Sequence, residues 1–226
     1  MPILAYILTA LVAYLIGSIP TGFLVGRAKG IDIRAAGSGN IGATNAMRVL
    51  GKPAGIFVLL LDALKGYAAC AFLPPLIYNW LEPHFYGLAP GFAAESPELK
   101  MKFYVVAGIF AVLGHNYTCW LKFKGGKGIA TTAGVYLALA PTALGIALAA
   151  FLLAVVLTRY ASIGSITGAV VLPVAVWFTC DNWLFRAVTI VLGAMAIYRH
   201  RKNIQRLMAG TENRIGKKAQ PPEEKK

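Results

Sequence analysis

The chain has 226 residues, of which 58% are hydrophobic and only 14% are charged, and its mean hydropathy is +0.64. A soluble domain of this length could not bury so much apolar side chain, so the composition indicates an integral membrane protein with no obvious second domain. The net charge of +13 lies in loops between apolar stretches, which argues against nucleic-acid binding and is typical of a membrane protein with a basic cytoplasmic face.

The apolar stretches predict an all-α membrane fold of about seven transmembrane helices, some of them short or broken. We expect the first helix to be retained, because the N-terminus lacks the basic region and the clear small-residue cleavage site of a secretory signal. Pro141 divides one long stretch into a short helix and a longer one, and a polar break follows at 159–165. In chain order the predicted spans are 3–25, 53–76, 103–121, the two parts of 129–158, 166–178 and 184–198.

The basic residues predict the topology, because 18 of the 22 Lys and Arg residues would fall on one side of the membrane. This side is expected to be cytoplasmic, with the N-terminus outside and the C-terminus inside. A five-span alternative would leave 129–158 partly in the interface. Residues 1–216 would form one transmembrane domain with an outer loop at 78–102, and residues 217–226 a basic, disordered tail. The three cysteines fit small buried hydrophobes better than disulfides or metal ligands: Cys70, Cys119 and Cys180.

A lysine-glycine loop, KFKGGKG at 122–128, lies between two strongly apolar stretches. Glycines allow the backbone to approach a ligand closely, and Lys122, Lys124 and Lys127 supply positive charge. The run that starts at Ile129 is expected to begin a helix, whose free N–H groups would point back at the loop and favour an anion or a phosphate. The alternative is a short cytoplasmic turn whose lysines only set the membrane orientation.

The first polar loop contains GSGNIGATNAMR at 37–48. It matches the dinucleotide-binding glycine pattern, but no strand precedes it, so that interpretation is weak. We expect instead a backbone nest followed by a short helix capped by Thr44 or Asn45, with Thr44 and Arg48 on one helix face. An ordinary flexible loop with a helix cap is the alternative.

Three further groups of polar residues accompany these loops. Asp62 and Lys65 lie one turn apart inside a span, which favours a structural ion pair over a ligand contact. His115 ends the third span, and His200 and Asn203 begin the tail on the same predicted face. The sequence has no metal-ligand or nucleophile motif, so a metal-free reaction on a phosphorylated substrate is expected.

Three motifs resemble the cytoplasmic motifs of the bacterial PlsY family, the acyl-phosphate-dependent glycerol-3-phosphate acyltransferases. They are GSGNIGATN at 37–45, GHNY at 114–117 with FKGGKGIAT at 123–131, and YRHRKNIQRL at 198–207. DALKG at 62–66 and RYAS at 159–162 fit as well, so the resemblance runs from about residue 10 to Gly210. It implies a seven-helix fold in the bacterial inner membrane, with N-terminus outside and active site cytoplasmic. The implied reaction moves an acyl group from acyl-phosphate to the 1-hydroxyl of glycerol 3-phosphate, giving lysophosphatidic acid and phosphate.

The resemblance also implies the site residues, with no cofactor and no metal. Glu212 would be a structural member of the third motif, and the proton acceptor would be His200 or a substrate phosphate oxygen. The expected partners are glycerol 3-phosphate, a long-chain acyl-phosphate and membrane lipids, with the chain acting as a monomer. The residues expected to be catalytic are Ser38, Arg48, Lys127, His200 and Asn203. Those expected to bind or shape the substrate site are Gly37, Gly39, Asn40, Thr44, Asn45, His115, Lys124, Gly125, Gly126, Gly128, Ser162 and Ser165.

Two other classes of protein remain open at this point. A transporter for a phosphorylated or anionic solute would also carry broken helices and glycine loops, although its site is usually near the bilayer midplane and internal repeats are expected. An inactive scaffold would bind anionic lipids through the basic tail.

Overall fold

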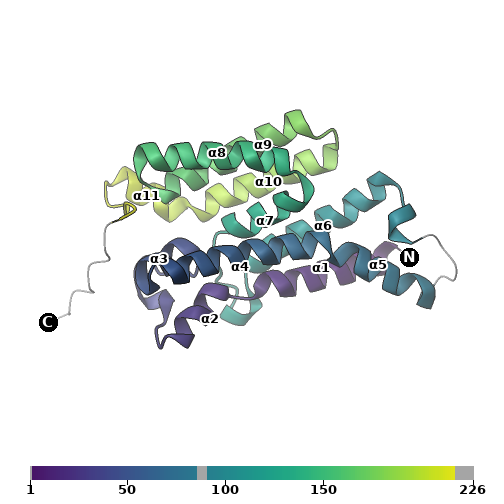
Figure 1. Cartoon of the computed structure of the whole chain (residues 1–226), viewed down its shortest axis with the longest axis horizontal. Helices are drawn as coiled ribbons and strands as arrows, with labels where there is room; N and C mark the ends of the chain where they lie inside the picture. Colours follow the sequence, from purple (N-terminus) through teal and green to yellow (C-terminus); the bar gives the residue numbers. More distant parts are fainter. Residues whose placement is uncertain (1, 86–90, 217–226) are drawn as a thin grey trace.

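The structure is a computed structural model that describes residues 2–85 and 91–216, and the predicted disordered tail lies outside these residues. The described chain is helical throughout (Figure 1). The longer helices are α1 (Pro2–Ser18), α4 (Lys52–Ala71), α5 (Leu73–Phe85), α6 (Pro97–Asn116), α7 (Ile129–Leu139), α8 (Pro141–Thr158), α9 (Ala161–Thr179) and α10 (Trp183–Arg199). The short ones are α2 (Thr21–Ala28), η1 (Ile33–Ala35), α3 (Ala43–Leu50), η2 (Phe92–Ala94), η3 (Cys119–Leu121) and α11 (Arg201–Met208).

Most of the apolar helices have the lengths that a bilayer requires. Within the described residues, five segments are long and apolar enough to cross a membrane, and they contain α1 with α2, α4 with α5, α6, α8 and α9. The two other predicted spans correspond to α7 and α10, which have 11 and 17 residues. The helix break predicted at Pro141 is confirmed, since α7 ends at Leu139 and α8 begins at Pro141. Much of α8 faces outward, because Leu153, Val156 and Leu157 are exposed, as lipid contact allows.

Helix pairs pack closely where small residues meet. The main pairs are α1 with α6, α4 with α7, and α8 with α9, and α10 packs beside α9 (Figure 1). Between α4 and α7 the backbones approach so closely that a Cβ at Gly134 would lie 1.8 Å from the Ala63 carbonyl oxygen. A Cβ at Gly66 would lie 2.1 Å from the Thr131 carbonyl oxygen. Glycines at both crossing points therefore fix the position of α7, as is common for packed membrane helices.

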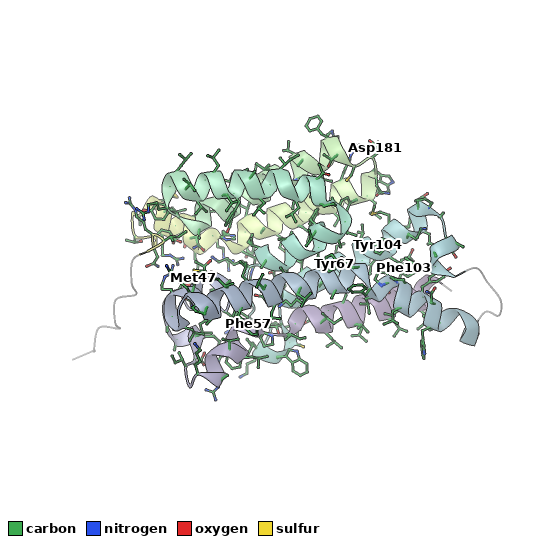
Figure 2. The ribbon with its side chains drawn as sticks, viewed as in Figure 1. Met47, Phe57, Tyr67, Phe103, Tyr104 and Asp181 are labelled. Carbon is green, nitrogen blue, oxygen red and sulfur yellow. The ribbon has the colours of Figure 1, made fainter. Side chains whose placement is uncertain are left out.

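The chain reverses direction from helix to helix, so alternate connections gather at the two ends of the bundle. Figure 2 shows Met47 of α3 toward one end and Asp181, between α9 and α10, at the other. The end with α3 and α11 lies away from the N-terminus (Figure 1). We call it the basic end, because it also holds the lysine-glycine loop and Arg159. The predicted convergence of the polar loops on one face is thus observed.

The outer loop predicted at 78–102 is wrong for most of its length. Helix α5 continues to Phe85, and α6 begins at Pro97, six residues before the predicted start. Ser96 caps α6 by accepting a hydrogen bond from the Leu99 N–H at 3.2 Å, and Pro97 suits the first helical position. Two charged residues of the predicted loop, Glu98 and Lys102, lie inside α6 and form an ion pair one turn apart. Residues 86–90 lie outside the described part of the chain.

The polar break predicted at 159–165 is also shorter than expected. Only Arg159 and Tyr160 separate α8 from α9, and Arg159 ends α8 with a left-handed φ of 64°. Ser165 belongs to the second turn of α9, where its hydroxyl donates to the Ala161 carbonyl at 2.9 Å. Because a serine hydroxyl can satisfy itself on its own helix, the polar composition did not require a loop.

Candidate active site

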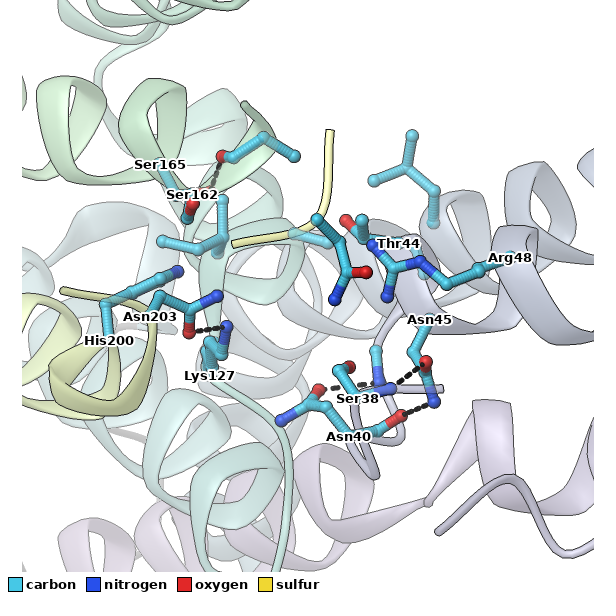
Figure 3. A pocket seen from close by; sticks show the side chains of 18 of the residues that line it. Ser38, Asn40, Thr44, Asn45, Arg48, Lys127, Ser162, Ser165, His200 and Asn203 are labelled. Carbon is cyan, nitrogen blue, oxygen red and sulfur yellow. Dashed lines mark hydrogen bonds between the residues drawn. The ribbon is translucent and has the colours of Figure 1, made fainter. Parts of the chain in front are cut away.

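A pocket with a volume of about 150 Å³ opens at the basic end of the bundle. Its walls come from α3 and the loop before it, from the middle of α4 and of α8, from the end of α6, from the starts of α7 and α9, and from α11 with the segment that follows (Figure 3). Twelve predicted site residues line it: Ser38, Asn40, Thr44, Asn45, Arg48, His115, Lys127, Gly128, Ser162, Ser165, His200 and Asn203.

One wall of the pocket is formed by α3 and the glycine loop before it, and Asn45 holds these two segments together. Its side-chain oxygen accepts the Ser38 N–H at 2.8 Å, and its amide donates to the carbonyls of Ile33, Ala36 and Asn40 at 3.1, 3.1 and 2.8 Å. These bonds fold the glycine loop against α3 and leave the Ser38 hydroxyl at the pocket. Asn45 is buried and fully engaged, so its part in the site is structural.

The cap predicted for α3 is wrong. Gly42 occupies the N-cap position without a side-chain cap, and Thr44 and Asn45 lie inside the helix. Asn40 steadies the turn by accepting the Gly42 N–H at 2.8 Å. The predicted sharing of one helix face is observed, since Thr44 and Arg48 lie one turn apart and both line the pocket. Among the described residues the Arg48 guanidinium has no hydrogen-bond partner, so its donors are available to a ligand.

Lys127 and Asn203 connect the lysine-glycine loop to α11 (Figure 3). The lysine Nζ donates to the Asn203 side-chain oxygen at 2.6 Å, and the Asn203 amide donates to Glu212 at 2.7 Å. Glu212 also accepts from the Ser162 hydroxyl at 3.0 Å and from Arg206 Nε at 2.6 Å. One carboxylate thereby ties α9, α11 and the segment after α11 to the same side of the pocket.

The electrostatics of this network favour an anion. Burial, together with the cations Arg206, Arg199 and Arg48, lowers the pKa of Lys127 to about 8, although Glu212 partly opposes them. Burial would raise the pKa of Glu212, yet the hydrogen bonds from Asn203, Arg206 and Ser162 hold that pKa below its usual value. Lys127 is therefore still mostly charged at neutral pH, but it is held in surroundings that an added negative charge would stabilise.

His200 presents a neutral ring to the pocket. Burial, and then the charge of Lys127, lowers the pKa of His200 to about 4. Its Nδ1 lies 2.8 Å from the Ala196 carbonyl, so this nitrogen carries the proton and the other nitrogen is left as an acceptor.

Besides α11, which follows α10 directly at His200, three helices begin at the pocket without a side-chain cap. They are α3, which follows Gly42, α7, which follows Gly128, and α9, which follows Tyr160. Gly128 reaches this position through a left-handed φ of 83°, which glycine adopts without strain. Residues from the first turn of each helix line the pocket. The free N–H groups and the positive ends of three helix dipoles thus converge on one space, the arrangement that binds anions at helix N-termini.

A buried ion pair lies beneath the pocket, as predicted for Asp62 and Lys65. Lys65 Nζ is 2.8 Å from Asp62 Oδ1 and also donates to the Ile19 carbonyl at 2.9 Å. The Thr21 hydroxyl donates to the same carboxylate at 3.0 Å, and His115 Nδ1 lies 3.6 Å from it. These bonds join the α1–α2 break to α4, which supports the structural interpretation, and Asp62 and His115 also line the pocket floor.

Five predicted site residues do not line the pocket: Gly37, Gly39, Lys124, Gly125 and Gly126. The glycines lie in the backbone of the two loops, and Lys124 is exposed. Other residues that line the pocket were not predicted from the sequence. Arg206 could have been found, because it lies three residues after Asn203 on the same helix face. Asn213 and Ile215 line the pocket from a segment without a motif, and no sequence signal marked them.

The fold and the site together define a multi-pass membrane protein with an open pocket at one end of its helix bundle, whose basic groups and helix N-termini suit negatively charged groups. The comparisons with known proteins give the family. The family model described as glycerol-3-phosphate acyltransferase matches residues 7–210, so the chain belongs to the glycerol-3-phosphate acyltransferase family of enzymes. The family and the fold class predicted from the sequence are both confirmed.

Similar proteins share almost the whole chain. The glycerol-3-phosphate acyltransferase of Geobacter sulfurreducens is 47% identical over 209 residues, which covers 92% of this chain and 96% of that protein. The one from Thermosynechococcus vestitus is 43% identical, with coverage of 92% and 94%. The crystal structure of PlsY, an integral membrane glycerol 3-phosphate acyltransferase, in its glycerol 3-phosphate form is 34% identical with a TM-score of 0.78 and coverage of 93% and 96%. The lysophosphatidic acid form is 36% identical with a TM-score of 0.75 and coverage of 93% and 95%.

Proposed function

We propose that this pocket transfers a fatty acyl group from acyl-phosphate to the 1-hydroxyl of glycerol 3-phosphate, giving lysophosphatidic acid and inorganic phosphate. The observation that carries the proposal is the convergence of three uncapped helix N-termini with Lys127 and Arg48 on one pocket. Both proposed substrates carry a phosphate, and so do both products. The solved forms of the similar PlsY hold glycerol 3-phosphate in one case and lysophosphatidic acid in the other, which supports the same substrate and product for this chain.

The two walls of the pocket suit two phosphate groups. On one wall, Arg48 offers a guanidinium that has no hydrogen-bond partner within residues 2–85 and 91–216, and the Ser38 and Thr44 side chains lie beside it (Figure 3). On the other wall, Lys127 lies at the start of α7 beside the free N–H groups of that helix. The charges that these groups neutralise would otherwise keep the two anionic substrates apart. Bound on facing walls, the two substrates bring hydroxyl and acyl carbon within reach of each other.

The proposed reaction needs no covalent acyl-enzyme. The 1-hydroxyl oxygen attacks the acyl carbonyl carbon and forms the new C–O bond, and the bond between that carbon and the phosphate oxygen breaks. Because acyl-phosphate is a mixed anhydride, the leaving group departs as inorganic phosphate without further activation. Lys127 and the helix N–H groups stabilise the negative charge that develops on the phosphate and the carbonyl oxygen.

The proton of the 1-hydroxyl is taken up by a phosphate oxygen of the substrates, with His200 accepting a hydrogen bond from the hydroxyl and orienting it. A ring with a pKa of about 4 is a weak base at neutral pH, whereas a phosphate monoester titrates with a second pKa of about 6. The acceptor nitrogen of the neutral ring is free of the Ala196 bond and suits the orienting role.

The His200→Asn variant separates these two roles. We expect turnover to fall by less than about 100-fold, because an essential general base contributes about 10²- to 10⁴-fold. The measurement is kcat at saturating glycerol 3-phosphate, with the helical circular dichroism of the variant as a control for folding. A loss of a thousandfold or more in a folded variant would instead identify His200 as the base.

The acyl chain reaches the pocket from the bilayer. Leu59 of α4 and Phe151 of α8 line the pocket on its apolar side, and Leu59 is also exposed toward the surroundings of the bundle. A volume of about 150 Å³ suits a small polar substrate rather than a whole long chain, which therefore lies between helices or in lipid. The basic end faces the cytoplasm of a bacterial cell by the positive-inside rule.

The assay that tests the proposal uses the purified chain in lipid, with acyl-phosphate and glycerol 3-phosphate. Release of phosphate in equal amount to lysophosphatidic acid is expected, and acyl-thioester donors are expected to give neither product. Uptake of glycerol 3-phosphate into vesicles without phosphate release would instead favour a transporter and overturn the acyltransferase mechanism.

A further inference from the structure

Arg199 connects the end of α10 to the lysine-glycine loop by bonding to backbone carbonyls of that loop. It is the last residue of α10 and directly precedes His200. Its Nε donates to the Gly126 carbonyl at 3.1 Å, and its Nη2 donates to the carbonyls of Gly126 and Gly125 at 2.7 and 3.0 Å. The two glycines belong to the lysine-glycine loop, more than 70 residues earlier in the chain. One guanidinium therefore holds two successive carbonyls of the loop that carries Lys127.

The other side of the loop is tied to α6. The Gly125 N–H donates to the Asn116 carbonyl at 3.1 Å, and the Gly126 N–H donates to the His115 carbonyl at 3.0 Å. A Cβ at Gly126 would lie 2.1 Å from His115 Nε2, so the loop packs directly on that ring. Gly125 and Gly126 thus have their N–H groups bonded to α6 and their carbonyls bonded to Arg199.

Arg199 is itself held in place. Its guanidinium lies 5.1 Å from the centroid of the Tyr117 ring and is half-buried. A planar guanidinium can bond two carbonyls and stack on a ring at the same time, and a lysine ammonium cannot reproduce this geometry.

We propose that Arg199 is a positioning residue of the acyl transfer, which sets the place of the Lys127 ammonium relative to His200 and Asn203. This inference rests on the proposed function, because it concerns the same pocket. Lys127 follows Gly126 directly and bonds to Asn203, so a displaced loop would move the ammonium away from the phosphate that it is expected to hold. Arg199 is not among the residues that line the pocket, so the proposed role acts through the loop rather than through contact with substrate.

The test compares Arg199→Ala and Arg199→Lys with Arg201→Ala. Arg201 is the matched control, since it is two residues away, carries the same charge, and bonds only to its neighbour Tyr198 at 3.3 Å among the described residues. We expect kcat/KM to fall about 100-fold in Arg199→Ala and less in Arg199→Lys, because a displacement of about 1 Å in a site can cost this much. Arg201→Ala should stay within about threefold of the unaltered chain by the same reasoning.

Two further measurements separate positioning from simple loss of folding. Guanidinium chloride at millimolar concentration should restore part of the activity of Arg199→Ala and leave Arg201→Ala unchanged. The acetylation rate of Lys127, measured by mass spectrometry against exposed Lys202, should rise in Arg199→Ala and in Arg199→Lys, because the ammonium is no longer held against Asn203. Arg199→Lys supplies the answer if the alanine variant does not fold.

The outcomes distinguish the two proposals. Normal activity and normal Lys127 acetylation in the Arg199 variants would overturn the positioning role, and so would an equal loss in Arg201→Ala. If the unaltered chain releases no phosphate from acyl-phosphate, the proposed function fails. The acetylation rates then still decide whether Arg199 positions the loop.

Discussion

Lys127 carries the charge on which the site depends, and its surroundings set the pH range of that charge. Glu212, Arg206, Arg199 and Arg48 are the charged groups that act on it, and Asn203 accepts its hydrogen bond. Because burial and the three arginines oppose protonation, the pKa of Lys127 falls to about 8. The ammonium is therefore present below this pH and lost above it, and the stabilisation of phosphate is lost with it.

We accordingly expect kcat/KM for glycerol 3-phosphate to decline above about pH 8. The measurement is a pH–rate profile of phosphate release between pH 6 and 10. His200 does not account for this limb, since its pKa of about 4 leaves it neutral throughout the range.

The Lys127→Arg variant supplies the control. A guanidinium stays protonated across the whole range, so the alkaline decline should disappear even where the rate itself is lower, because the two cations differ in geometry. An alkaline limb that persists unchanged in this variant would contradict the assignment to Lys127.

At the scale of single residues, the sequence predicted the residues that line the pocket better than the residues that hold them in position. Ser38, Thr44, Arg48 and His200 were predicted from local motifs, and all four line the pocket. Arg199 could not be predicted, because its partners are backbone carbonyls of a distant loop and any sequence could supply them.

The position of α7 is set by the closeness of its contact with α4. The Cβ of an alanine at Gly134 would lie 1.8 Å from the Ala63 carbonyl oxygen, which rigid backbone cannot avoid. We expect Gly134→Ala to destabilise the fold by about 1–3 kcal/mol and to lower activity, because Lys127 lies in the loop that leads directly into α7. The measurement is the thermal unfolding midpoint in detergent together with phosphate release.

Gly145→Ala is the matched control for this prediction. Gly145 lies in α8 with nothing within 4 Å of an added Cβ, so the same substitution creates no clash. Alanine there should stabilise the helix by about 0.5–1 kcal/mol and leave activity unchanged. Equal destabilisation at both positions would show that packing of α7 on α4 is not the cause.

At the scale of helices, the sequence predicted which segments are helical better than it predicted where each helix begins and ends. Hydropathy located the apolar spans, and Pro141 marked the true start of α8. Polar composition misplaced the ends, because Ser165 satisfies its hydroxyl within α9 and Glu98 pairs with Lys102 within α6. The cap of α3 was misassigned for a related reason, since the Asn45 side chain bonds to the preceding loop rather than to the helix start.

At the scale of the whole molecule, the proposed function depends on the difference between the two ends of the helix bundle, because only the basic end holds the pocket. The basic end gathers the pocket and the lysine-glycine loop, while Asp181 and Phe103 of α6 lie toward the other end (Figure 2). In the proposed mechanism, charged substrates reach the pocket from the water on one side of the membrane, and the acyl chain reaches it from the bilayer. The cytoplasmic orientation that the positive-inside rule predicts would open the pocket to substrates inside the cell.

The chain's own cysteines can test this orientation. Cys119, in η3, lies at the basic end, and Cys180, between α9 and α10, lies at the opposite end. Both are partly exposed, whereas Cys70 is buried, so only these two are expected to react with a membrane-impermeant maleimide.

In intact spheroplasts of a bacterial host the reagent should label Cys180 and not Cys119, because the positive-inside rule places the basic end in the cytoplasm. Permeabilisation should then expose Cys119, and the Cys119→Ser and Cys180→Ser variants assign each signal. Labelling of Cys119 alone in intact spheroplasts would place the pocket outside the cell, where no cytoplasmic acyl donor could reach it.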